Sequence, residues 1–511
     1  MRLVSVSAWP PKGHLRTRLM RLGCGLALSL SMATASTAQV PMRKDVNELS
    51  PVEVAALRRA VAQMKAWDQA PPGSANYKRS WKYWANMHYH FGADCGGPPS
   101  NRPGMAGQVA MVATSADEKA TWCKCKHGDY SFLTWHRMYL YYFERVLQSA
   151  AGDASLRLPY WDYQRNPELP LAFRELTFTA AGGAKTDNPL YAANRRSALN
   201  AGGGLDPDVA DVEEAFLREA YWDEGSGFNE TLEVQPHGAV HCAIGAAGCR
   251  SGLMGHPATA AQDPIFYLHH ANIDRLYECW LRVDPANRLP SDAAKVKERY
   301  SFPDAGGEIR TRAVDDMLQT SQLGYGYTRM GSCPTGAAGG AKMLRLTTPV
   351  RYVVSGAGAI AGESAAAPLT IPTEARPDVK AQTMLSGPGS EAVLAVEGLK
   401  FDREPASLYK VYLSSGASKS AFIGLVDFFA GGPGHHGHGA HGDADAGRTV
   451  RFRITQALQD LNLTEADLAS TRLIFQPATG VAGETPAAGQ ALNLGDEKLR
   501  YEAISLLIDK P

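Results

Sequence analysis

The chain has 511 residues, which is long enough for two or three domains. Its 52 basic and 52 acidic residues give a formal net charge of zero, and no segment gathers basic residues into a stripe. This balance argues against a nucleic-acid partner.

The first 38 residues have the pattern of a secretory signal peptide. Basic residues up to Arg21 precede an apolar run from Leu22 to about Ala35, and small residues ending at Ala38 supply a cleavage site. The apolar run is too short to span a membrane, although an uncleaved anchor is the alternative. We therefore expect an exported mature protein, periplasmic or secreted, with no membrane attachment once the signal is removed.

Helices are predicted along the first part of the mature chain. Ser50 and Glu53 form a capping box, which predicts a helix from residue 51 to about residue 67. After a turn, Ser80 is the N-cap of a second helix over residues 81–91 that is rich in aromatic residues. Both helices belong to a helical region that also contains most of the histidines.

Four of these histidines lie on or beside predicted helices in the first half of the region. His88 and His90 are about 200° apart on an ideal helix, so only one of them can face a common site. His127 lies in a loop, and His136 lies in the first turn of the helix that follows it, which begins at about Thr134. Loop and helix can therefore bring these side chains together.

The second half of the region adds a second histidine set. Pro236 marks the first turn of a helix on which His237 and His241 are one turn apart, with their imidazoles on one face and roughly 6 Å between the Cβ atoms. The next predicted helix carries the adjacent pair His269 and His270. Three neutral imidazoles without a thiolate or a carboxylate suit copper, zinc, iron or nickel.

The pattern changes beyond residue 325 to short alternating apolar runs between Gly/Ala-rich segments. The alternation predicts strands. We expect a linker at 335–350 and an all-β domain at 351–511. A glycine-rich loop in that domain contains His435, His436, His438 and His441. A flexible surface loop is the simpler interpretation of this segment, and capture of copper ions is the alternative.

Seven of the eight cysteines follow the predicted signal peptide, and an oxidising compartment favours their pairing. Cys242 and Cys249 are close enough in sequence to close a small loop. The other two pairings are guesses among several, and an odd count leaves one cysteine over. The guessed pairs are Cys95 with Cys123 and Cys279 with Cys333, which leaves Cys125.

Two segments within about residues 50–330 resemble the copper motifs of type 3 copper proteins, the family of tyrosinases, catechol oxidases and haemocyanins. The first motif is similar to ANMH followed by CKHGDYSFLTWHRMYLYYFER, and the second to EVQPHGAVH followed by DPIFYLHHANIDRLYECW. The Tyr325-Gly326-Tyr327 triplet is similar to the tyrosine motif of polyphenol oxidases. GLKFDREPASLYKVYL resembles, more weakly, the C-terminal domain of plant-type enzymes.

This resemblance implies a mainly α catalytic domain at 39–334, with a four-helix bundle around a dinuclear copper site. It implies two copper ions, Cu A and Cu B, that bind dioxygen as co-substrate. The implied ligands are His88, His127 and His136 for the first ion, and His237, His241 and His270 for the second. His90 is the alternative to His88, while His269 and His256 are expected to lie near the site without binding metal.

The resemblance also gives roles to residues around the implied ligands. Cys125-x-His127 is similar to a motif in which a thioether joins the sulfur to the imidazole; a free or differently paired thiol is the alternative. Glu233 is implied to orient a water that deprotonates a phenol, against the alternative of an ordinary acid near a helix N-terminus. Asp274 is a candidate acceptor for a ring nitrogen of a ligand histidine, and a surface salt bridge is the alternative.

Two positions depart from the implied pattern. Gly238 follows the first ligand of the second copper, where the family usually has an asparagine that assists the glutamate. Pro257 stands at the gate position, where many plant enzymes have a bulky phenylalanine. The small gate favours access of monophenols, whereas the missing amide weakens their deprotonation.

The expected function is a copper oxidoreductase that uses dioxygen to convert o-diphenols to o-quinones, with hydroxylation of monophenols left open. Small phenols are the expected partners, and no copper-delivery partner is indicated. The C-terminal domain is implied to shield the site. The alternatives are a haemocyanin-like dioxygen-binding protein and a zinc protein with coincidental motifs.

Overall fold

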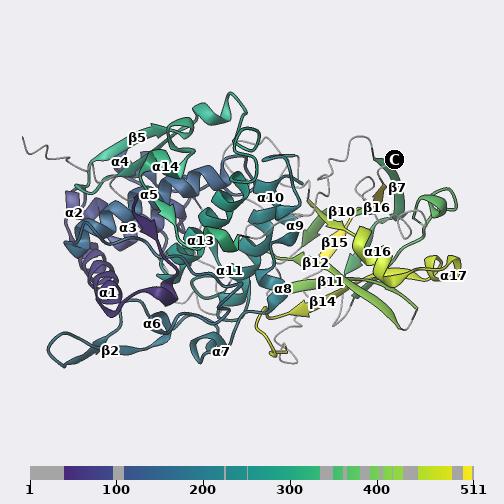
Figure 1. The fold of residues 1–511 in the computed structure, drawn as a ribbon, viewed down its shortest axis with the longest axis horizontal. Coiled ribbons are helices and arrows are strands. Elements are labelled where there is room, and N and C mark those ends of the chain that lie inside the picture. Colours follow the sequence, from purple (N-terminus) through teal and green to yellow (C-terminus); the bar gives the residue numbers. More distant parts are fainter. Residues whose placement is uncertain are drawn as a thin grey trace, which may run out of the picture. The chain divides into compact units, whose positions relative to one another are not determined.

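Helix α5 (Phe132–Ala151) runs through the middle of the helical region, packed against α1 (Pro51–Ala66) and α13 (Ile265–Leu281) (Figure 1). Its core-facing side includes Trp135, Tyr139 and Phe143, all buried. Aromatic side chains of this size bury large areas and fix the helix in place. The two histidine-bearing helices α5 and α13 are thus held side by side in one core.

The computed structural model describes residues 40–95, 109–223, 226–249, 251–333, 349–360, 365–379, 392–401, 405, 407–416, 418–429, 447–485 and 499–508. The predicted signal peptide, most of the linker and the four histidines of the glycine-rich loop lie outside these residues. In the described residues no helix is long and apolar enough to span a membrane.

The helices that carry or support the site follow the predicted caps closely. Ser50 and Glu53 make both bonds of the capping box at the start of α1, as predicted. The second predicted helix ends earlier than expected, because Tyr89 is extended (φ −165°, ψ 161°) and closes it at residue 88. The other α-helices of this region are α2 (Ala75–Lys78), α3 (Trp81–His88), α4 (Ala116–Thr121), α6 (Leu171–Arg174), α7 (Ser197–Asn200), α8 (Pro207–Ala210), α9 (Glu213–Phe216), α10 (Phe228–Leu232), α11 (Ala239–Ile244), α12 (Pro257–Ala260) and α14 (Thr320–Leu323).

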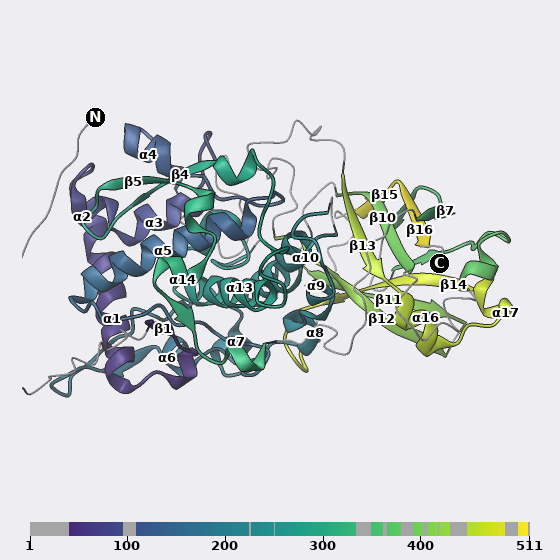
Figure 2. The same ribbon diagram turned by 45° about the horizontal axis from the view of Figure 1, so that its top comes forward.

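The strand-rich region, whose strands the alternating sequence predicted, contains two antiparallel sheets (Figure 2). Strand β14 alternates buried and partly exposed residues, so one of its faces is covered by the core. The first sheet has the order β7 (Val350–Ser355), β16 (Ala503–Ile508), β10 (Ala392–Phe401), β15 (Leu499–Tyr501) and β8 (Gly358–Ile360), with β13 (Arg448–Arg453) also paired to β10. The second has the order β12 (Lys419–Val426), β11 (Leu408–Ser415), β14 (Thr471–Ala478) and β9 (Ala365–Pro368).

The architecture is the expected one, a helical region followed by a strand-rich region, although the latter also contains the short helices α16 (Thr455–Leu461) and α17 (Glu465–Leu468). The two regions pack together in one compact unit from residue 40 onward. The Lys410 ammonium on β11 lies 2.8 Å from the Asp206 carboxylate and 2.7 Å from that of Asp208 at helix α8. The strand-rich region is therefore anchored to the helical region by charge as well as by packing.

Candidate metal centre

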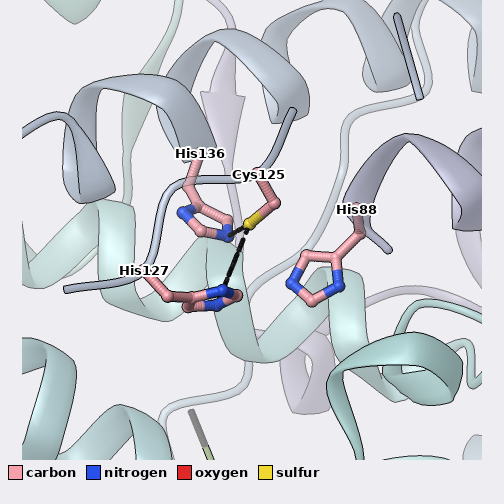
Figure 3. A group of neighbouring side chains, drawn as sticks. All are labelled: His88, Cys125, His127 and His136. Carbon is pink, nitrogen blue, oxygen red and sulfur yellow. Dashed lines mark hydrogen bonds between the residues drawn. The ribbon is translucent and has the colours of Figure 1, made fainter. Parts of the chain in front are cut away.

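Three histidines and one cysteine form the first group of possible ligands (Figure 3). His88 comes from the end of α3, His127 from the loop before α5, and His136 from the first turns of α5. The four side chains are buried, and each offers a ligand atom within 4.8 Å of the others. His90 lies outside this group, 3.7 Å from the Asp94 carboxylate, so the structure brings His88 rather than His90 to the site.

Four histidines form the second group. His237 lies in segment η3 (Glu233–Gly238) and His241 in α11, while His269 and His270 come from α13. Gln235 is extended (φ −135°, ψ 122°), so the helix that carries the first two begins at about Pro236, as predicted. All four are buried and offer ligand atoms within 4.8 Å of one another.

The two groups face each other. The rings of His136 and His270 are stacked with centroids 4.3 Å apart, and those of His127 and His237 have centroids 5.7 Å apart. The Nε2 atoms of His241 and His270 approach to 3.4 Å. Two ions held by the two groups would therefore be neighbours.

Backbone carbonyls fix the orientation of four rings. In each case Nδ1–H donates to a carbonyl, which directs Nε2 into the site and sets the tautomer. Among the described residues, Nε2 of His88 and of His237 is buried without a hydrogen-bond partner. The pairs are His88 with Pro257 (3.0 Å), His136 with Phe132 (2.8 Å), His237 with Glu233 (2.9 Å) and His241 with Met254 (2.9 Å).

Burial also keeps these imidazoles neutral, because a buried positive charge is poorly solvated. It lowers the pKa of His88 to about 4 and that of His237 to about 3. Buried neutral imidazoles with inward, unpartnered nitrogens are the donors that a transition-metal ion requires. The residues present thus fit copper at both groups.

The two candidates of the adjacent pair occupy different positions. The His270 ring lies between the two groups, against His136 and beside His241, whereas the His269 ring stacks on His237 and lies near Tyr163. The position of the His270 ring makes this residue, rather than His269, the better placed candidate ligand. His256 instead caps helix α12, where its Nδ1 accepts a hydrogen bond from the Ala258 N–H at 3.0 Å.

The prediction that Asp274 accepts a hydrogen bond from a ligand histidine is wrong, and so is its surface alternative. Asp274 is buried and accepts from Arg137 Nε at 2.6 Å and from the hydroxyls of Tyr325 at 2.8 Å and Tyr327 at 2.6 Å. Burial alone would raise the pKa of Asp274, but Arg137 and Arg43 outweigh it and lower the value. The carboxylate joins α13 to α5 behind the histidines.

The disulfides match the guessed pairs, Cys95–Cys123, Cys242–Cys249 and Cys279–Cys333, and Cys125 is free and buried. Cys125 Sγ is 3.7 Å from Nδ1 and 3.8 Å from Nε2 of His127, so the sulfur is almost equally distant from the two ring nitrogens. It is also 3.4 Å from Nε2 of His136. Burial raises the pKa of the Cys125 thiol well above its ordinary value.

Two further predicted residues, Glu233 and Pro257, lie beside the two groups. Glu233 is buried, and its carboxylate accepts a hydrogen bond from the Gly128 N–H at 2.7 Å. Its backbone carbonyl accepts a hydrogen bond from Nδ1–H of His237, four residues later in the chain. Burial holds the pKa of its carboxyl group well above the ordinary value. Pro257 is buried at the start of α12, where its carbonyl orients His88.

The aromatic residue nearest to the second group comes from the strand-rich region and was not predicted. The ring of Phe429, three residues beyond β12, is stacked on His241 with centroids 3.7 Å apart and an interplanar angle of 9°. It also lies 5.5 Å from His237 and 5.9 Å from His127. In the sequence, the segment is marked only by two adjacent phenylalanines between a predicted strand and a glycine-rich loop. This pattern does not predict which residues the phenylalanine rings contact.

The family model described as the common central domain of tyrosinase matches residues 78–215 and 208–283, a span that includes both histidine groups. The tyrosinase HcTyr1 of Hahella sp. (strain CCB-MM4) is 30% identical over 400 residues, covering 70% of this chain and 78% of that protein. The chain belongs to the tyrosinase family. It is an enzyme of the type 3 copper oxidase class, as the resemblance implied.

Other tyrosinase-family relatives extend the similarity. The chloroplastic polyphenol oxidase of Malus domestica is 24% identical over 398 residues, covering 68% of this chain and 64% of that protein. A structure of latent aurone synthase, a polyphenol oxidase, matches with a TM-score of 0.56 at 19% identity, covering 93% of this chain and 91% of that one. Deoxygenated haemocyanin from Rapana thomasiana matches with a TM-score of 0.50 at 19% identity, covering 86% and 99%. At these identities the structural matches establish the fold alone.

Proposed function

We propose that this tyrosinase-family enzyme binds two copper ions and uses dioxygen to oxidise o-diphenols to o-quinones. The observation that carries the proposal is the pair of facing imidazole groups whose inward nitrogens are oriented by backbone carbonyls. The first ion would be held by His88, His127 and His136, and the second by His237, His241 and His270. Bound copper supplies dioxygen binding and electron transfer, which no side chain of the protein can supply.

Metal removal tests this proposal. Purified protein should contain two copper ions per chain, and chelation should abolish oxygen uptake with catechol. Copper should restore the uptake and zinc should not, because zinc has no redox chemistry. A copper-loaded protein that binds dioxygen reversibly but turns over no catechol, even after limited proteolysis near residues 335–365, would instead be a haemocyanin-like carrier.

We also propose that Cys125 and His127 become joined by a thioether. The sulfur lies within 3.8 Å of both ring nitrogens of His127, and a bond to the ring would lock the one ligand that lies on a loop. The step would replace one S–H and one C–H bond with an S–C bond, and the proposed co-substrate dioxygen would take up the two electrons and two protons. Peptide mapping of copper-loaded protein should show a loss of two hydrogens from the linked peptides, whereas two separate unmodified peptides would contradict the bond.

The shielding role proposed for the strand-rich region rests on Phe429. Its ring covers one face of His241, and we propose that a planar phenol would stack on this same face. A phenol and this ring cannot share that position, so the full-length enzyme would be latent. Release of the ring would open the site to small phenols.

The proposed location is outside the cytoplasm. Three disulfides support an oxidising compartment, where such bonds form and persist. N-terminal sequencing of the exported protein should give a start near Gln39, and an intact first segment would contradict cleavage there.

A further inference from the structure

The backbone conformation at position 238 does not require a glycine. Gly238 has φ −63° and ψ −39°, ordinary helical values that any residue adopts. Glycine within a helix costs about 0.5–1 kcal/mol relative to alanine. A different requirement must therefore account for the missing side chain.

The close approach of a residue from the strand-rich region supplies that requirement. A Cβ atom placed on Gly238 would lie 2.7 Å from the carboxyl carbon of Asp427 and 3.0 Å from its Oδ2, and the second oxygen would be nearer still. Carbon atoms in contact are normally about 3.5–4.0 Å apart. The Asp427 carboxylate thus occupies the space that a side chain at position 238 would need.

The carboxylate cannot leave this space without loss. Asp427 is buried, and its Oδ1 accepts a hydrogen bond from the Phe429 N–H at 3.0 Å. This bond forms a tight turn that directs the Phe429 ring onto His241. Displacement of Asp427 would therefore displace the ring as well.

We propose that Gly238 is the seat for the shielding segment Asp427–Phe429, and that its missing side chain is what allows the strand-rich region to close the site. The inference rests on the proposed function for its consequence, latency, but not for the contact itself. It makes Gly238 and Asp427 positioning residues that act through Phe429. A methyl group at position 238 would push the turn away while distant anchors such as Lys410 with Asp206 stay in place.

The test uses full-length protein and four variants: Gly238→Ala, Asp427→Ala, the double variant, and Gly331→Ala as a control. A Cβ on Gly331 meets nothing within 4 Å, and this glycine is not in the left-handed region. Two properties are measured, namely hydrogen exchange of the segment ending at Phe429 and oxygen uptake with catechol. Hydrogen exchange requires no copper, so it reports on the seat even if the proposed function fails.

Gly238→Ala should raise both the exchange of this segment and catechol oxidation by about tenfold, the size expected for overpacking a buried contact. Asp427→Ala should loosen the segment because it removes the acceptor for the Phe429 N–H. In that background the alanine at 238 should have less than about a twofold further effect, since the colliding carboxylate is gone. Gly331→Ala should behave as the wild type.

Equal effects of Gly238→Ala with and without Asp427, or no effect at all, would overturn the proposal. If Gly238→Ala alone does not fold, a folded double variant would support the proposed role of Gly238. Failure of both variants to fold would overturn that proposal. Absence of catechol oxidation in every variant, with the exchange pattern as stated, would overturn the proposed function and leave the seat established.

Discussion

At the scale of single residues, backbone carbonyls take the place of carboxylate partners for the ligand histidines. His136 and His237 each donate to a carbonyl four residues earlier in the chain, so their orientation follows from the local chain path. His88 and His241 depend instead on carbonyls of Pro257 and Met254, in the segment between the two halves of the second copper motif. Because carbonyls persist through side-chain substitution, a changed side chain at the carbonyl-bearing residues should leave the orientation of these rings intact so long as the backbone path is kept.

Glu233 provides a residue-scale test of monophenol hydroxylation. If its carboxylate orients a water that takes the phenol proton, Glu233→Gln should lower tyrosine hydroxylation at least about 100-fold, the usual range for general-base catalysis. Catechol oxidation should change less than about threefold, because o-diphenols lose their protons more easily. Both rates are measured as oxygen uptake by enzyme whose site has been opened by limited proteolysis.

The matched control for this prediction is Glu230→Gln. Glu230 lies one turn earlier in α10 and accepts from the Gly227 N–H, so it supports the helix start rather than the site. Its replacement should leave the ratio of the two rates unchanged. Equal losses of both rates in Glu233→Gln would assign this residue a structural role only.

Residues whose geometry is local were predicted correctly from the sequence. The i/i+4 spacing of His237 and His241 and the start of the helix at Pro236 depend on neighbouring residues. The contact of Phe429 with His241 joins residues that are far apart in the chain, and no local pattern encodes it. The misassigned Asp274 shows the same limit, since its true partners include Tyr325 and Tyr327, more than fifty residues later.

At the scale of elements, the buried cluster around Asp274 holds the two ligand helices together. Arg137 follows His136 on α5, and Asp274 lies one turn beyond His270 on α13. Tyr327 in β6 (Gly326–Tyr327) closes the cluster, and Arg43 lies within 3.5 Å of the carboxylate. We therefore expect the spacing of the two proposed copper sites to depend on a charge pair that contacts neither histidine group.

Asp274→Asn should destabilise the protein by about 3–5 kcal/mol, the usual cost of leaving buried charges without their partner. Denaturant unfolding followed by tryptophan fluorescence measures this loss. The folded-state pKa of Asp274 lies below its ordinary value of 3.8, so its stabilisation is present above that value and is lost as the pH falls through the folded-state pKa. The variant should therefore lose less stability on acidification than the wild type.

Asp304→Asn is the control, because Asp304 pairs with the exposed Arg310 and exposed pairs contribute little. An Asp274→Asn protein as stable as this control would show that the cluster does not hold the helices together. The cluster was not predicted as a unit, although the tyrosine motif was noted, because sequence alone did not show that four elements meet at one carboxylate.

At the scale of the whole molecule, the strand-rich region is joined to the catalytic region both at the site and away from it. Phe429 reaches the histidines, while Lys410 with Asp206 and the bridge between Leu205 and Val481 hold the surrounding surfaces. The sequence predicted two regions in the right order and classes, because helical and alternating periodicities differ. The sequence could not predict the interface between the two regions, because that interface is built from short segments of both regions.

We propose that this dicopper diphenol oxidase is held latent by its own C-terminal region. Latency is tested by oxygen uptake with catechol, measured on copper-loaded protein before and after limited proteolysis at residues 335–365. We predict a rise of about tenfold or more, since a closed state favoured by only ~1.4 kcal/mol already leaves about one molecule in ten open. Unchanged or lower uptake by the trimmed protein, with both copper ions retained, would contradict the claim.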